Sequence, residues 1–149
     1  MPQKSENKND ESNQYISWDD ERYSINNEEI DSQHKKLIDI CNSLYDSHQR
    51  GDTIDGIRNA LLAIVEYART HFKDEEGLMS EIGFPGLNRQ KKSHREFLDR
   101  ITGFLQELRR GHQISALRLL AFLKNWIEDH IENEDKLIGS FLKAKKAEV

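Results

Sequence analysis

Residues 57–82 read IRNALLAIVEYARTHFKDEEGLMSEI, and one face of this stretch decides the fold. Its apolar side chains recur every three or four residues, a spacing that gathers them on one side of an α-helix. The positions on this face are Ile57, Leu61, Ile64, Ala68, His71, Glu75, Leu78 and Ile82. A histidine and a glutamate therefore lie on an otherwise apolar, interior face. Because burial without partners is unfavourable for both groups, the pattern predicts a bound metal ion.

Three further stretches repeat this spacing. Their interior positions are Ile30, His34, Leu37, Cys41 and Leu44; then Leu87, Gln90, His94, Phe97, Ile101, Phe104 and Leu108; then Leu120, Leu123, Ile127, His130, Asp135, Ile138 and Leu142. Breaks at residues 51–52, 83–86 and 111 separate the stretches, and two of these breaks are short enough to make neighbouring helices antiparallel. We therefore predict an all-α fold, an up-down-up-down four-helix bundle.

The last stretch contains one irregular step. Its interior positions are five residues apart between His130 and Asp135, where the other steps are three or four. Either the helix tilts at this point or a wide turn is inserted, so that both side chains reach the same centre. Wide turns of this kind are frequent at functional sites.

The segments outside the bundle are polar or irregular. Residues 1–14 read MPQKSENKNDESNQ and are predicted to form a disordered polar tail, so that residues 15–149 make up one domain. Residues 15–25 carry Trp18 and Tyr23 but have no helical period. We expect them to form an extended arm packed over the end of the bundle.

Composition excludes several classes of function. The chain has 149 residues and a formal charge of -5, with acidic and basic residues interspersed, which argues against nucleic acid or an anionic membrane as the main partner. It has no apolar run long enough to span a membrane and no apolar signal-peptide core. The single cysteine, Cys41, excludes an intramolecular disulfide and favours the cytoplasm. We interpret Cys41 as a buried, inert thiol.

Six side chains on these interior faces are candidate metal ligands: His34, His71, Glu75, His94, His130 and Asp135. Imidazole and carboxylate ligands without a thiolate suit iron, manganese or zinc, and two carboxylates that can bridge favour a two-metal centre. His48 and His112 lie beside helix ends, where capping or solvent contact explains them. The ferritin-like pattern needs Glu-x-x-His on two helices and is disfavoured, because the nearest match, 31–34, occurs once.

These residues and their neighbours resemble a bacterial hemerythrin. The resemblance rests on Trp18, the phrase IDSQHKKL at 30–37, HFKDEE at 71–76 with Met79, Pro85, HREF at 94–97, Trp126 and HIENEDK at 130–136, and covers about residues 15–143. It implies two irons joined by an oxo or hydroxo bridge and by the carboxylates of Glu75 and Asp135. The iron held by His34 and His71 would keep an open position for dioxygen. An apolar lining that includes Ile127 would exclude water from it.

The chain departs from that family at the second iron. His94 and His130 match two of its three histidines, but the third is expected four residues before His94, where this chain has Gln90. Three outcomes are open: Gln90 coordinates weakly through its carboxamide oxygen, water or a small anion takes the position, or the second site binds metal poorly. We favour water or an anion.

The resemblance implies an oxygen-binding protein for dioxygen binding, storage or sensing, and not primarily an enzyme. Two alternatives follow from the altered second site. One is a peroxide- or O2-reactive di-iron enzyme. The other is a redox-signalling module that would act through a separate protein partner.

Overall fold

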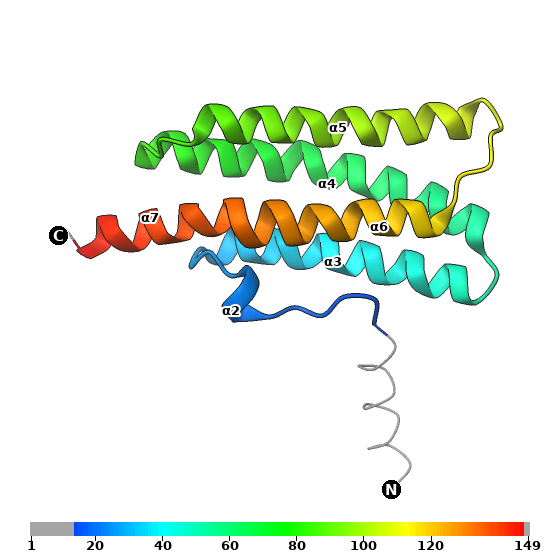
Figure 1. The fold of residues 1–149 in the computed structure, drawn as a ribbon, viewed down its shortest axis with the longest axis horizontal. Helices are drawn as coiled ribbons and strands as arrows, with labels where there is room; N and C mark the ends of the chain where they lie inside the picture. The colour runs from blue at the N-terminus through cyan, green and yellow to red at the C-terminus, as the bar shows by residue number, and fades with distance from the viewer. Residues whose placement is uncertain (1–13, 148–149) are drawn as a thin grey trace, which may run out of the picture.

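The computed structural model describes residues 14–147, and its four long rods lie side by side with alternating direction (Figure 1). The first three rods are α3 (Glu28–Gln49), α4 (Thr53–Ile82) and α5 (Leu87–Arg109). The fourth is one continuous rod built from α6 (Ala116–Trp126), the π-helix η1 (Ile127–Asp135) and α7 (Lys136–Ala147). Within residues 14–147 there is no strand. The predicted all-α, up-down-up-down bundle is confirmed.

The helix ends follow from local side chains. Asn27 begins α3 by accepting a hydrogen bond from the Ile30 amide at 3.0 Å, and Ser115 begins α6 in the same way. Gly83 ends α4 with φ of 69°, a left-handed conformation that glycine adopts without steric penalty. The next amide, of Phe84, returns to the carbonyl of Met79 at 2.9 Å and closes the turn.

The predicted interior faces form the core. All the positions named from the spacing are buried except Leu78, Ile82, Leu87, Leu108 and Leu142, which are partly buried. Those five lie towards helix ends, where fewer neighbouring helices surround a side chain. The hydrophobic spacing therefore predicted both the number of helices and the face that each one buries.

The irregular step between His130 and Asp135 is the π-helix η1. A π-helix forms hydrogen bonds between residues five apart, so side chains five apart lie on the same face. Of the two explanations offered by the sequence, the inserted wide turn is correct. The fourth rod regains α-helical geometry at Lys136 and continues to the end of α7.

The sequence predicted an extended arm before the bundle, but the arm is not wholly extended. It contains one helical turn, α2 (Asp20–Tyr23), because the Asp19 carboxylate accepts a hydrogen bond from the Glu21 amide at 3.0 Å and so caps the turn. Arg22 on this turn forms two contacts with Glu132 of η1, at 2.7 and 3.1 Å. The arm therefore reaches the segment that carries His130 and Asp135.

The predicted disordered tail lies almost entirely outside the described residues, which begin at Gln14. Across residues 14–147, the helices are too short or too polar to cross a membrane.

One glycine tests how closely the arm packs on the bundle. A Cβ added at Gly139 of α7 would lie 2.9 Å from the Cα and 2.9 Å from the carbonyl oxygen of Ile25. Because both atoms belong to the backbone, Gly139→Ala should lower the free energy of unfolding by about 1–3 kcal/mol. Gly103→Ala is the matched control: it adds the same methyl on α5 with nothing within 4 Å. It should be neutral or stabilise by up to about 1 kcal/mol. Urea unfolding measures both, and equal effects would contradict this packing.

Candidate metal centre

The six predicted ligands converge inside the bundle, although they come from four separate segments. His34 lies on α3, His71 and Glu75 on α4, and His94 on α5; His130 and Asp135 lie on η1. All six side chains are buried, with residue exposures of 4% or less. The fold thus brings all six predicted ligands together at the same depth in the bundle interior.

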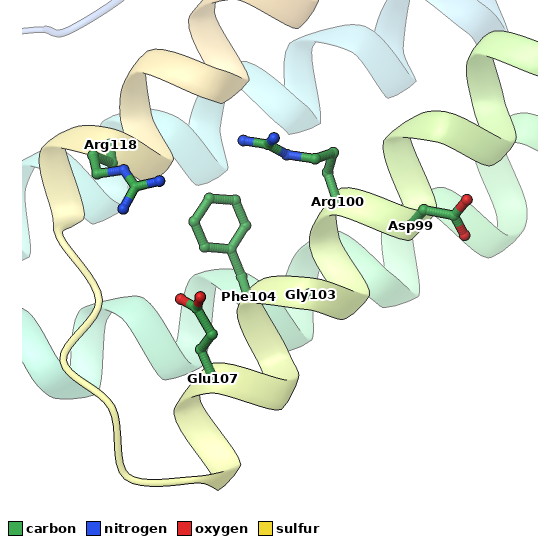
Figure 2. A pocket seen from close by; sticks show the side chains of 6 residues that line it. All are labelled: Asp99, Arg100, Gly103, Phe104, Glu107 and Arg118. Atoms are coloured by element: carbon green, nitrogen blue, oxygen red, sulfur yellow. The ribbon is translucent and has the colours of Figure 1, made fainter.

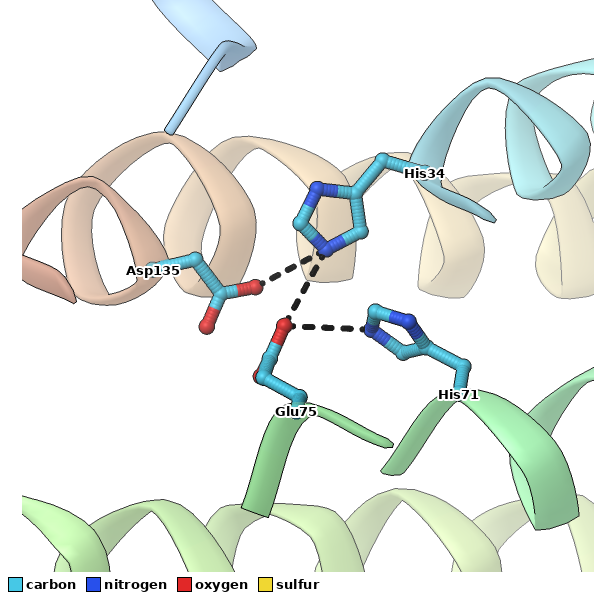
Figure 3. A group of neighbouring side chains, drawn as sticks. All are labelled: His34, His71, Glu75 and Asp135. Carbon is cyan, nitrogen blue, oxygen red and sulfur yellow. Dashed lines mark ion pairs between the residues drawn. The ribbon is translucent and has the colours of Figure 1, made fainter. Parts of the chain in front are cut away.

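A first group combines two histidines with both carboxylates (Figure 3). Nε2 of His34 lies 3.3 Å from Oε2 of Glu75 and 3.2 Å from Oδ2 of Asp135. Nε2 of His71 lies 3.2 Å from the same Glu75 oxygen. One ligand atom from each of the four residues lies within 4.8 Å of all the others, close enough for one cation to bind them together.

The other oxygen of each carboxylate lies near the second pair of histidines, where Glu75, His94 and His130 form a second group of potential ligands. Oε1 of Glu75 lies 3.1 Å from Nε2 of His94 and 3.9 Å from Nε2 of His130. Oδ1 of Asp135 lies 3.2 Å from the same His130 nitrogen. Each carboxylate therefore directs one oxygen to each pair of histidines, which is the arrangement needed to bridge two cations.

The donor atoms fit first-row metal ions in spacing and in chemistry. Two ligands at right angles around a cation about 2.1 Å away lie about 3.0 Å apart, close to most of the separations above. Within residues 14–147, four of these buried atoms have no hydrogen-bond partner: Nε2 of His34 and of His130, Oε2 of Glu75 and Oδ2 of Asp135. Buried polar atoms are rarely left unsatisfied, and bound cations would satisfy all four.

The residues that contact the outer nitrogens of the imidazoles were not predicted from the sequence. Nδ1 of His71 lies 2.7 Å from the amide oxygen of Gln33, and Nδ1 of His94 lies 2.8 Å from Glu76. Nδ1 of His130 lies 2.6 Å from Glu134. The contacts of Gln33 with His71 and of Glu76 with His94 orient these rings with Nδ1 outwards and leave Nε2 free to bind metal. The sequence offers one signal for these contacts: Gln33, Glu76 and Glu134 are each next to a predicted ligand in the chain.

Aromatic rings enclose the centre. Phe72 stacks on His94 with ring centroids 3.9 Å apart, and Trp126 stacks on His130 at 4.0 Å. Tyr67 stacks on His71 at 4.9 Å. Ile127, predicted to line the oxygen site, is fully buried one turn before His130. Its contact with dioxygen stays a prediction.

Gln90 lies beside the second group, but its amide nitrogen faces the ligands. Nε2 of Gln90 donates a hydrogen bond to Oδ1 of Asp135 at 3.0 Å, and the residue is 3% exposed. Its amide oxygen is buried without a partner. The predicted inward orientation is therefore correct, and the amide contacts the Asp135 carboxylate.

The residues assigned to other roles lie outside both groups of ligands. Nδ1 of His48 lies 3.2 Å from the hydroxyl of Thr53, and His112 is exposed. Cys41 is a buried free thiol whose pKa is raised to about 12 by burial. A surface pocket of about 230 Å³ between α5 and α6, lined by Phe104 among others, also contains none of the predicted ligands (Figure 2).

Protons and metal ions compete for this cluster. Burial alone lowers the pKa of His34, but the carboxylates of Asp135 and Glu75 outweigh it and raise the pKa to about 9. The same balance, with Asp135 as the main partner, raises the pKa of His130 to about 11. Burial would raise the pKa of Glu75, but the His71 charge and contacts with neighbouring imidazoles bring it well below its usual value. Metal binding must therefore release protons from the imidazoles.

A helical bundle that gathers four histidines around two shared carboxylates defines a class, the non-haem proteins that hold two metal ions. Comparison with known proteins identifies the family. Residues 26–142 match the family model described as Hemerythrin HHE cation binding domain, and the chain belongs to the hemerythrin family. It is a non-haem di-iron protein that binds dioxygen.

Individual relatives agree with this membership. The Bacteriohemerythrin of Clostridium acetobutylicum is 29% identical over 123 residues, which cover 80% of this chain and 95% of the relative. The Bacteriohemerythrin of Stenotrophomonas maltophilia is 32% identical over 133 residues, 85% of this chain and 81% of the relative. A crystal structure of a hemerythrin variant gives a TM-score of 0.79 at 26% identity, covering 87% of this chain and 98% of that one. The family and fold predicted from the sequence are confirmed.

The pKa shifts predict how pH acts on the metal-free protein. Because its folded-state pKa is raised, His34 contributes stability that is complete below about pH 6.5 and is lost as pH rises through about 9. Thermal unfolding of chelator-treated protein should therefore show falling stability from about pH 6.5 to about pH 8.5, by up to about 1.4 kcal/mol per pH unit for each such group. Above that range the buried Cys41 thiol adds its own loss.

The His34→Gln variant is the control for this range and should lose less stability. Adding Zn²⁺ should reverse the trend, so that the rise in Tm caused by the metal grows with pH, because metal ions displace protons. A metal-free protein whose stability does not change over this range would contradict the assignment.

Proposed function

We propose that this chain binds dioxygen reversibly at an iron pair in which each pair of histidines holds one iron and both carboxylates bridge. The ligands of the first iron would be His34 and His71, those of the second His94 and His130, and the bridges Glu75 and Asp135. The observation that carries this assignment is the division of carboxylate oxygens: each carboxylate directs one oxygen to each pair of histidines.

The residues around the pair support reversible binding. When bound, the two ferrous ions supply electrons to dioxygen and recover them on release. Gln33 holds the His71 ring in place, because its amide also donates to Asp74 at 2.8 Å and so directs its oxygen to His71. Phe72 and Ile127 are buried beside the histidines and exclude water, which slows irreversible oxidation.

We propose further that Gln90 does not replace the missing histidine as a ligand. Its amide nitrogen, which has no free lone pair for a metal, points to Asp135 at 3.0 Å. Water or a small anion would then complete the coordination of the second iron. Both irons would have an exchangeable position, which favours faster autoxidation and a role in sensing or scavenging over durable oxygen carriage.

The setting of the protein is also a proposal. Cys41, the single cysteine, is buried as a free thiol, which suits a reducing compartment, and we propose the cytoplasm. The net charge of -5 argues against nucleic acid as a partner. A separate protein partner stays a prediction.

Metal content tests the ligand assignment. Purified protein loaded with Fe²⁺ should hold two irons per chain and develop a new visible absorption band when exposed to dioxygen. His71→Ala should lose the band, because it removes a ligand of the oxygen-binding iron, and its iron affinity should fall by about 100-fold or more. His112→Ala removes an exposed histidine outside the site and should match the parent protein. Equal iron content and spectra in both variants would contradict the assignment.

Gln90→His tests the altered position. The new imidazole would supply the third nitrogen ligand of the second iron, so iron retention should rise by about tenfold or more and autoxidation should slow. Gln90→Leu is the matched control, because it keeps a buried side chain of similar size and removes the hydrogen bond to Asp135. It should bind the second iron no better than the parent. Equal autoxidation rates in the parent and Gln90→His would contradict the proposed role of this position.

A further inference from the structure

The outer nitrogens of the four histidines have unequal partners. In the second group, Nδ1 of His94 faces the Glu76 carboxylate at 2.8 Å and Nδ1 of His130 faces the Glu134 carboxylate at 2.6 Å. In the first group, Nδ1 of His71 faces a neutral amide oxygen at 2.7 Å, and Nδ1 of His34 has no hydrogen-bond partner. Anionic partners are thus confined to the group that lacks its third histidine.

The chemical consequence is a difference in ligand strength. A carboxylate that accepts the outer N–H of an imidazole draws the proton towards itself and leaves more electron density on Nε2, the atom that binds metal. Hydrogen bonds to ionised acceptors are roughly twice as strong as those to neutral ones, so an amide partner has a smaller effect. The two histidines of the second group are therefore the better donors.

Both carboxylates are held for this contact. Glu76 follows Glu75 on α4, so the helix that supplies a bridging ligand to the centre also supplies the partner of His94. Glu134 precedes Asp135 on η1 and accepts a hydrogen bond from the Ser93 hydroxyl at 3.3 Å. Each glutamate side chain is 28% exposed, so it contacts a buried imidazole on one side and solvent on the other.

We infer that Glu76 and Glu134 are positioning residues that strengthen the two histidines of the second iron and offset the imidazole that Gln90 does not supply. This inference rests on the proposed function, because it assumes that His94 and His130 bind the second iron. It assigns the protein an asymmetric iron pair: a second iron held by fewer but stronger nitrogen ligands, and a first iron whose histidines have neutral or no partners.

The two contacts differ in geometry, which predicts an order of effects. Glu76 and His94 form a hydrogen bond of ordinary length. Glu134 lies closer to His130, at 2.6 Å, but within residues 14–147 this contact is an ion pair without a hydrogen bond to Nδ1. Glu76 should therefore contribute more to donor strength than Glu134.

Glu76→Gln and Glu134→Gln test the inference, since each keeps an acceptor oxygen and removes the negative charge. Glu96→Gln is the matched control: Glu96 is exposed on α5, two residues after His94, so the variant removes one charge near the same histidine. A reciprocal double variant, Gln33→Glu with Asp74→Asn, gives His71 a carboxylate partner and leaves the net charge unchanged. The amide introduced at position 74 can donate to the carboxylate introduced at position 33, which preserves the contact between these positions in reverse.

Two measurements distinguish an effect on the donor strength of the histidines from an effect on folding. Competition with a chelator should show the affinity for the second iron falling about 10- to 100-fold in Glu76→Gln, less in Glu134→Gln, and not in Glu96→Gln. Mössbauer spectra of ⁵⁷Fe-loaded protein should show one of the two iron signals shifting in the Glu76 and Glu134 variants. The reciprocal variant should shift the other signal. A merely structural role would not select one iron.

The possible results separate this inference from the proposed function. Two irons per chain in the parent protein, with affinities and spectra unchanged in Glu76→Gln and Glu134→Gln, would overturn the inference alone. A loss of affinity equal to that of Glu96→Gln would also overturn it, since charge alone would then explain the effect. A parent protein that never binds a second iron would refute the proposed function and, with it, this inference.

Discussion

The structure depends on two buried carboxylates that are each shared by two pairs of histidines. Glu75 and Asp135 are fully buried, and a buried charge is tolerated only where opposite charges or metal ions compensate it. The four imidazoles surround these two carboxylates, and each rod of the bundle supplies one of them. The cluster therefore forms only where all four rods converge.

Much of this arrangement could be predicted from the sequence, because two spacings encode it: the three- to four-residue spacing of the apolar side chains and one step of five residues. Apolar spacing marked the four helices and their interior faces, and His34, His71 and His94 occupy regular positions on those faces. The step of five between His130 and Asp135 indicated the π-helix. Ligands that lie on interior faces are visible in a sequence, since their polar character contradicts the apolar pattern around them.

Residues outside the interior faces were not predictable in the same way. Glu76 and Glu134 look like ordinary charged surface positions, and their contacts with imidazoles depend on how neighbouring helices are rotated. The turn α2 was missed because it is a single turn, too short for a periodicity to appear. The inward orientation of Gln90 was predictable, but the choice between its oxygen and its nitrogen depends on Asp135, which lies 45 residues away.

The π-helix η1 is an unusual element, because π-helices are rare and this one carries two of the predicted ligands, His130 and Asp135. The arm contributes the Arg22–Glu132 pair, whose side chains are 46% and 28% exposed, and exposed ion pairs of this kind contribute little to stability because water screens them. Ile127 and Ile131 are both buried on the same turn, and burying an isoleucine contributes about 1.5–3 kcal/mol. Apolar packing therefore contributes more to the stability of this segment than the ion pair with the arm does. The π-helix places His130 and Asp135, five residues apart, on one face of the fourth rod.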